Sequence, residues 1–161
     1  MWSFDTDRLS VRPLSDASRA RGLAAEFVSL LTPAVLAPLP ASLQLGEGPD
    51  AVANWIAERL AESDVSLVRM RGDETLVGAL ICVQPEPGGP VHLGYLFGEA
   101  AWGRGYATEM LSGLVTIAGP QPLRAGVARD NPASARVLEK VGFHVDHEAS
   151  TERVLNYRHP E

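Results

Sequence analysis

Two glycines stand between a β-rich run and the clearest helical repeat of the chain, and this junction limits the folds that the sequence can adopt. The run Val91–Phe97 favours a strand, and Gly103 and Gly105 follow it. From Tyr106 onward apolar residues recur at helical spacing, until Gly119 ends the repeat. We therefore predict a strand, a glycine-rich turn and a helix in direct succession.

A glycine-rich turn at the start of a helix is suited to hold a phosphate group. The first N–H groups of a helix have no partner within it, and the helix dipole makes this end positive. Arg104 adds a cation between the glycines. The alternative is a tight turn in which glycine provides backbone freedom only. A dinucleotide fingerprint would need a third small residue at Thr108, and a P-loop would need Gly-Lys-Ser/Thr, so neither pattern is complete.

The rest of the chain predicts strands and helices without an internal repeat. The expected strands cover residues 6–13, 65–70, 75–83, 91–97, 123–130, 143–148 and 153–158. The expected helices cover residues 16–31, 50–63, 106–118 and 132–141, the first capped by Ser15 or Asp16. Because Thr32-Pro33 and further prolines interrupt the helical pattern, we expect residues 32–50 to be irregular. This order of elements indicates an α/β (α+β) fold.

Composition and charge exclude several classes of function. Hydrophobic residues make up 45% and charged residues 21% of the 161 residues, which is typical of one compact domain. The formal net charge of −6 provides no cationic field, so we expect no nucleic-acid partner. No apolar run approaches the ~20 residues that span a bilayer, and the first residues lack a signal-peptide pattern. We therefore expect a cytoplasmic protein without membrane contact. The only cysteine, Cys82, lies in an apolar run, and we expect it in the core.

Three motifs, one of them containing the glycine-rich turn, occur in order along the chain after a β-rich opening segment. The opening segment is Thr6–Leu14, and the motifs are Gly94–Phe97, Trp102–Glu109 and Asn131–Phe143. Together they resemble the GCN5-related N-acetyltransferases (GNAT), in particular the branch of ribosomal-protein N-terminal acetyltransferases. The resemblance implies a single N-acetyltransferase domain over residues 1–161, with a mixed, mostly antiparallel sheet flanked by helices. It also implies that the strands at 91–97 and 123–130 splay apart.

The resemblance further implies acetyl-CoA as the cosubstrate and identifies the residues that contact it. The family's pyrophosphate loop corresponds to Gly103, Arg104, Gly105, Tyr106, Ala107 and Thr108. The strand contact with the pantetheine arm corresponds to Leu96 and Phe97. Asn131 corresponds to a residue that faces the same arm, although a helix N-cap explains this asparagine equally well. Ala100 stands where the broader family often has Gln or Arg. We expect no metal ion.

Two catalytic candidates follow from the resemblance and from acid–base chemistry. Ser134 corresponds to a serine assigned, in ribosomal-protein acetyltransferases, as the acid that protonates the leaving thiolate, and a structural first-turn serine is the alternative. Many other members use a tyrosine at the place of Leu138. His92 lies on the strand that leads to the turn, and histidine suits proton removal from an amine, whereas an exposed edge residue is the alternative. Weaker candidates for the base are His147, Glu148, Glu152 and Tyr157.

We thus expect an enzyme that transfers an acetyl group to a primary amine by direct attack in a ternary complex. One alternative is an acyl-CoA-binding module without turnover, suggested by Leu138 and Ala100, and another is a transferase that uses a longer acyl-CoA. The acceptor is a peptide or protein N-terminus or a small-molecule amine. Trp55 and Ile56 fall where the family shapes its acceptor pocket, although core positions explain them too. We expect either a monomer or a homodimer.

Overall fold

The computed structural model describes residues 2–14 and 18–160. Its strands are β1 (Phe4–Asp5), β2 (Leu9–Pro13), β3 (Asp64–Met70), β4 (Leu76–Val83), β5 (Val91–Phe97), β6 (Leu123–Ala128), β7 (His144–Asp146) and β8 (Val154–His159). Its helices are α1 (Ser18–Val28), α2 (Pro33–Leu36), α3 (Ala51–Glu62), α4 (Tyr106–Ala118) and α5 (Pro132–Lys140), with 3₁₀ turns η1 (Ala41–Leu43) and η2 (Glu99–Ala101). No helix in this part of the chain has the length and apolar character needed to cross a membrane.

Most predicted elements are present near their expected bounds, and the segment 32–50 is the main exception. Residues expected to be irregular there form α2 and η1. The reason is that Thr32 Oγ1 accepts the N–H of Val35 at 3.4 Å, and Pro33 occupies the first turn of α2. Thr32-Pro33 therefore begins a short helix instead of only ending one. The predicted caps at Ser15 and Asp16 lie outside the described residues.

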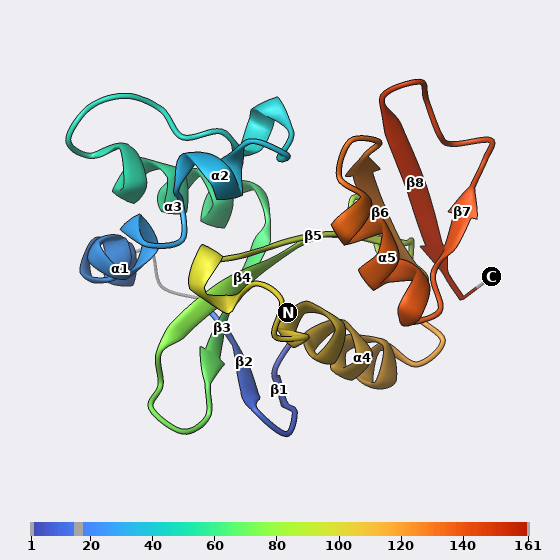
Figure 1. Ribbon diagram of the computed structural model, residues 1–161, viewed down its shortest axis with the longest axis horizontal. Helices are drawn as coiled ribbons and strands as arrows, with labels where there is room; N and C mark the ends of the chain where they lie inside the picture. Colours follow the sequence, from blue (N-terminus) through green and yellow to red (C-terminus); the bar gives the residue numbers. More distant parts are fainter. Residues whose placement is uncertain (1, 15–17, 161) are drawn as a thin grey trace.

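The described strands form one eight-stranded sheet in the order β1-β2-β3-β4-β5-β6-β8-β7 (Figure 1). Every neighbouring pair is antiparallel except β5 and β6, which run parallel. The last strand, β8, enters the sheet between β6 and β7. The predicted mixed, mostly antiparallel sheet is therefore confirmed.

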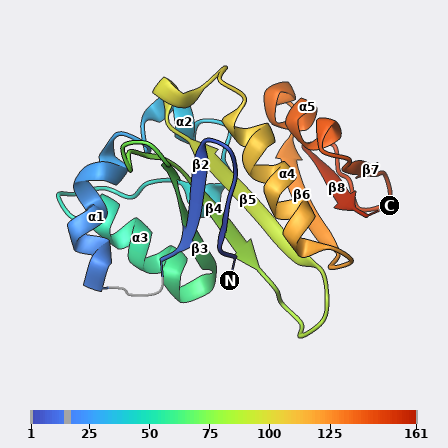
Figure 2. The same cartoon turned by 90° about the horizontal axis from the view of Figure 1, so that it is seen from below.

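The helices divide between the two faces of the sheet, with α1 and α3 on one face and α4 and α5 on the other (Figures 1 and 2). Trp55 and Ile56 of α3 are only 2% and 1% exposed, so both belong to the core between the sheet and helices α1 and α3. Met110 and Leu114 of α4 lie in the core between the other face of the sheet and helices α4 and α5. Because strand residues alternate between faces, the even-numbered residues of β5 face α1 and α3, and the odd-numbered residues face α4 and α5.

The parallel pairing of β5 with β6 stops after three residue pairs, of which Leu93 with Ala125 is the last. Beyond this point the two strands diverge, and we call the opening between them the fork. Each strand stays paired on its outer side, β5 with β4 up to Phe97 and β6 with β8 up to Ala128. The predicted splay of the two central strands is therefore present, and it leaves backbone groups of β5 facing a gap.

The buried stripe of α4 gives a test of this fold. Leu114 is 0% exposed, so Leu114→Ala is expected to lower the free energy of unfolding by about 2–5 kcal/mol, measured by urea denaturation. Ile117→Ala is the control on the same helix, because Ile117 is 43% exposed and its truncation is expected to cost less than about 1 kcal/mol. Equal losses in both variants would contradict the assigned packing of α4.

Candidate active site

The glycine-rich turn leads from the end of β5 into α4 through two residues with left-handed backbone. Gly103 and Gly105 have φ angles of +70° and +78°, which residues with a side chain rarely adopt. A Cβ atom added to Gly103 would meet no atom within 4 Å, so the backbone here borders open space. Gly105 is the N-cap of α4 and carries no side chain that could cover the first N–H groups. The turn therefore presents the positive end of α4 to an anion.

A network from the N-terminal segment, which we call the loop clamp, ties this turn to the sheet. It consists of Thr6, Arg8 and Glu109. Thr6 Oγ1 and the backbone N–H of Arg8 donate to Glu109 Oε1 at 2.6 and 2.8 Å, and Arg8 Nε donates to Glu109 Oε2 at 2.6 Å. Arg8 Nη1 also donates to the carbonyl of Arg104 at 3.0 Å. Burial raises the pKa of Glu109, but the hydrogen bonds from Thr6 and Arg8 outweigh it and hold that pKa below its ordinary 4.5.

The loop clamp also brings a second cation to the turn, which sequence reasoning missed. The Arg8 guanidinium carbon lies 4.6 Å from the centre of the Tyr106 ring. Its Nη2 is 3.6 Å from the position that a Cβ atom of Gly105 would take. The predicted cation, Arg104, folds back over the turn, and its Nε donates to the carbonyl of Ala100 at 3.0 Å. Two guanidinium groups thus lie at the N-terminal end of α4.

The backbone N–H and C=O groups of the two predicted strand contacts, Leu96 and Phe97, point to opposite sides of β5. Gly98 N–H donates to the carbonyl of Val77 on β4, so by alternation the backbone groups of Leu96 also point toward β4. Those of Tyr95 and Phe97 then point into the fork. The carbonyl of Phe97 accepts the indole N–H of half-exposed Trp102 at 2.7 Å.

A side-chain hydrogen bond crosses the fork two residues beyond the last β5–β6 pair. The hydroxyl oxygens of Tyr95 on β5 and Ser134 on α5 are 2.7 Å apart. The two residues are 39 positions apart in the sequence, and the ring of Tyr95 packs edge-on against Phe97 at 6.4 Å. Sequence reasoning singled out Ser134 but not Tyr95. The structure therefore joins a predicted candidate to a residue that was noted only as part of a motif.

Asn131 serves as the N-cap of α5 in this structure. Its side-chain Oδ1 accepts the backbone N–H of Ser134 at 3.2 Å. This bond satisfies one of the first N–H groups of α5 and fixes the turn that carries Ser134. Asn131 and Ser134 thus lie together, on the α5 side of the fork.

His92 lies on the opposite face of β5 from Tyr95. It is exposed, and it belongs to the part of β5 that is still paired with β6, opposite Arg124. Gly94 follows on the same face at the point where the fork opens, and a Cβ atom added there would meet no atom within 4 Å. The structure thus separates the two catalytic candidates, with Ser134 joined to one face of β5 and His92 on the other.

The weaker candidates for the base lie outside the fork. His147 and Glu148 were expected in a strand over residues 143–148, but β7 ends at Asp146. Together with Glu152, they are exposed in the connection between β7 and β8. Tyr157 is 1% exposed, and its hydroxyl donates to Glu139 Oε1 at 3.1 Å.

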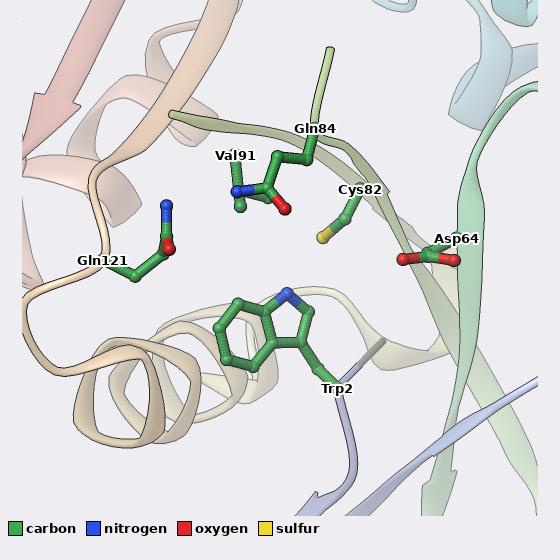
Figure 3. A pocket seen from close by; sticks show the side chains of 6 residues that line it. All are labelled: Trp2, Asp64, Cys82, Gln84, Val91 and Gln121. Carbon is green, nitrogen blue, oxygen red and sulfur yellow. The ribbon is translucent and has the colours of Figure 1, made fainter. Parts of the chain in front are cut away.

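Cys82 is buried in the core as expected. It is 4% exposed, and burial together with the charge of Asp64 raises the pKa of its thiol to about 12. Figure 3 shows the thiol pointing into a cavity of about 200 Å³ beside the Trp2 indole, at the end of β5 remote from the glycine-rich turn. Within residues 2–14 and 18–160, no group of three or more His, Cys, Asp or Glu side chains is arranged to hold a metal ion.

The segment before α3 contacts the entrance to the glycine-rich turn. Thr32 Oγ1, at the N-cap of α2, donates to Glu99 Oε2 of η2 at 2.6 Å. Gly98 approaches Leu30 so closely that an added Cβ atom would lie 2.9 Å from its Cδ2. The α1–α2 connection and the turn are therefore in direct contact.

Comparison with known families identifies this arrangement. Residues 8–144 match the family model described as the acetyltransferase (GNAT) domain. The chain belongs to the GNAT acetyltransferase family. No curated protein shows a significant sequence match to it.

Solved structures with the same GNAT fold cover nearly the whole chain. A GNAT-family acetyltransferase from Bacillus anthracis has a TM-score of 0.74 at 17% identity, over 98% of this chain and 96% of that one. The ribosomal L7/L12 α-N-protein acetyltransferase RimL, in complex with coenzyme A, has a TM-score of 0.71 at 17% identity, over 95% and 94%. A mutant of the spermidine N-acetyltransferase SpeG from Vibrio cholerae has a TM-score of 0.66 at 14% identity, over 93% and 92%. At these sequence identities, the similarity shows a shared fold.

The residues of the GNAT fork and turn fit acetyl-CoA, which enzymes of this family use. The open space beside Gly103, the exposed N-terminus of α4 and the guanidinium of Arg8 suit a diphosphate. The backbone groups of Tyr95 on the side of β6 have no strand partner, so they are suited to pair with the amides of a pantetheine arm. The chemistry of the fork and the glycine-rich turn is therefore compatible with the cosubstrate of the family.

The loop clamp gives a prediction that depends on pH. Glu109→Gln is expected to lower the free energy of unfolding by about 1–3 kcal/mol at pH 7, because it removes a carboxylate that accepts three hydrogen bonds. The folded-state pKa of Glu109 is lowered, so its stabilisation is present above the ordinary carboxyl pKa of 4.5 and is lost as pH falls through the lower folded value. The measurement is urea denaturation of both proteins over this pH range.

The control for this prediction is Asp5→Asn, which breaks the exposed ion pair between Arg12 and Asp5. Its effect is expected to stay below about 1 kcal/mol, because exposed ion pairs contribute little. A Glu109→Gln protein as stable as the wild type at pH 7 would contradict the role of the loop clamp.

Proposed function

We propose that this chain transfers an acetyl group from acetyl-CoA to a primary amine, with both substrates bound at once. The observation that carries the proposal is the continuity of the fork with the glycine-rich turn. The strand that loses its parallel partner after Leu93 leads through η2 directly to the N-terminus of α4. One extended molecule with an amide-containing arm and a diphosphate can therefore contact both at once. Acetyl-CoA has this shape and supplies the acetyl thioester.

On this proposal, the donor half of the site consists mainly of backbone groups and two arginines. The N-terminal groups of α4 from Gly105 onward, with Arg8 and Arg104 beside them, hold the diphosphate. The predicted contacts at Tyr106, Ala107 and Thr108 belong to the same first turn of α4. The N–H groups of Tyr95 and Phe97 hold the arm along β5 and polarise the thioester carbonyl. Their fixed orientation keeps the acetyl group in place for direct attack.

We assign the acid and the base to opposite faces of β5. Ser134 lies at the fork on the face of α4 and α5, where its hydroxyl can protonate the departing sulfur. His92 lies on the other face, beside the open space at Gly94. His92 is three residues from Tyr95, about 10 Å along a strand, so it takes the amine proton through a water chain.

The acceptor is a primary amine of a protein or of a small molecule. The similar structures RimL and SpeG are named for transfer to a ribosomal protein and to spermidine. The net charge of −6 favours a cationic acceptor by long-range attraction. These observations support a primary amine as the acceptor.

Filling the glycine-rich turn tests the donor site. Gly105→Trp is expected to reduce the affinity for acetyl-CoA at least about 100-fold in calorimetric titrations, because the indole would cover N–H groups whose hydrogen bonds to a charged group contribute about 1.5–3 kcal/mol each. Gly119→Trp is the matched control, because Gly119 also has a positive φ, of +56°, but lies at the other end of α4. Thermal unfolding of both variants checks that they are folded. Unchanged affinity in Gly105→Trp would refute the site.

Thiol release from acetyl-CoA tests the reaction. The wild-type protein is expected to release thiol with at least one member of a panel of peptide N-termini, lysine, polyamines and aminoglycosides. His92→Gln is expected to lower kcat by about 10²-fold and to retain acetyl-CoA affinity, since a general base contributes about 10²–10⁴-fold. Loss of acetyl-CoA affinity in His92→Gln would contradict the separation of base and donor site.

The same assay separates the alternatives. A protein that binds acetyl-CoA but releases no thiol with any amine would be a binding module, and the proposed transfer would be wrong. Faster release from succinyl-CoA or longer acyl-CoA than from acetyl-CoA would identify a different acyl donor.

A further inference from the structure

We propose that Tyr95 supplies the proton that Ser134 delivers, so that the two hydroxyl groups act as one acid unit at the fork. The inference deepens the proposed function and rests on it. Tyr95 acts through Ser134 and is therefore a positioning and proton-supplying residue. The observation is the 2.7 Å contact between the Tyr95 and Ser134 hydroxyl oxygens across a gap where strand pairing has already ended.

The surroundings of the two hydroxyls fix the direction in which they face the fork. Tyr95 is held by its strand and by the edge-on contact with Phe97. Ser134 is held in the first turn of α5 by the bond from its N–H to Asn131 Oδ1. The Ser134 N–H is thereby satisfied, so the Ser134 hydroxyl is left to interact with Tyr95 and with the occupant of the fork. When Tyr95 donates to Ser134, the remaining Ser134 proton points away from Tyr95.

The pair is a better acid than serine alone. If Ser134 gave up its proton without Tyr95, an alkoxide would remain, which is a far stronger base than a thiolate. With Tyr95 the negative charge ends on a phenol, whose ordinary pKa of about 10 lies much closer to that of a thiol, about 8.5. Burial raises the pKa of Tyr95, and the Ser134 bond partly opposes this, so the phenol remains protonated near neutral pH. The two causes of the shift in the pKa of Tyr95, burial and the hydrogen bond with Ser134, involve no charged side chain.

The proton steps balance as follows. As the carbon–sulfur bond breaks, its electron pair goes to sulfur, and Ser134 Oγ gives its proton to that sulfur. Ser134 takes the proton of Tyr95 Oη at the same time, which leaves a phenolate. The amine loses one proton through water to His92 as the carbon–nitrogen bond forms. Tyr95 recovers a proton from solvent, His92 releases one, and the net products are an amide and a thiol.

Kinetics of single and double variants test the coupling. Tyr95→Phe and Ser134→Ala are each expected to lower kcat by about 10- to 100-fold, at or below the lower limit of the roughly 10²–10⁴-fold typical of general-acid catalysis, because a thiolate leaves readily. The double variant is expected to be no slower than the slower single variant, because the two groups act as a unit. Ser134→Thr retains a hydroxyl and is expected to restore most of kcat. Acetyl-CoA affinity by calorimetry is expected to stay unchanged throughout.

Thr116→Val is the control for loss of a hydroxyl. Thr116 Oγ1 donates to the carbonyl of Ser112 at 2.8 Å on α4, outside the fork, and its removal is expected to leave kcat unchanged. A Tyr95→Phe protein with wild-type kcat would overturn the inference. So would additive losses in the double variant, or equal losses of kcat and acetyl-CoA affinity, which indicate a purely structural contact.

A spectroscopic titration gives a readout independent of turnover. In protein labelled with ¹³C at the tyrosine ring, the Tyr95 signal is assigned by its absence in Tyr95→Phe, and its pKa is measured by NMR. Because the Ser134 bond lowers this pKa, Ser134→Ala is expected to raise it. An unchanged titration would overturn the coupling. A wild-type protein that releases no thiol would instead refute the proposed function, so the two failures are distinguishable.

Discussion

The interruption of the ladder between β5 and β6 is the constraint on which the rest of the structure depends. Backbone groups inside a sheet are normally paired, and leaving them exposed costs free energy. Here β5 keeps its antiparallel partner β4 and β6 keeps β8, so the cost falls only on the inner edges of two strands. The opening leads directly to the N-terminus of α4. The proposed site for an extended thioester thus depends on backbone groups that β5 and β6 leave unpaired with each other.

The opening is useful only if its surroundings hold their geometry, and two sets of contacts do so. The loop clamp ties the turn to the β1–β2 connection, through contacts between residues about 100 positions apart. The Asn131 cap sets the first turn of α5, and with it the hydroxyl of Ser134. The residues of the proposed donor site therefore come from four distant segments, which the sheet brings together.

The parts of the fold and site that could be predicted from the sequence were those that depend on residues close together in the sequence. The strand at 91–97 and the helix at 106–118 matched their predicted bounds, because local periodicity and Gly119 define them. Arg8 was missed because its partner is Glu109, and an acidic residue in the first turn of a helix is already explained by the helix dipole. Tyr95 was missed because Ser134 lies on another element. For Leu96, the sequence predicts a strand, but it does not show toward which neighbouring strand the backbone groups of this residue point.

The short contact between β5 and β6 has a mechanical meaning. The two strands share three residue pairs, whereas β4 and β5 share six, as do β6 and β8. The sheet thus consists of two leaves joined by a short seam, with β1 to β5 in one leaf and β6 to β8 in the other. Helix α4 contacts β1 and β2 of the first leaf, and it also contacts α5. Of the three pairings that join β4, β5, β6 and β8, this seam is the shortest. The separation of the two leaves at the opening is therefore set by these three residue pairs and by the packing of α4 against α5.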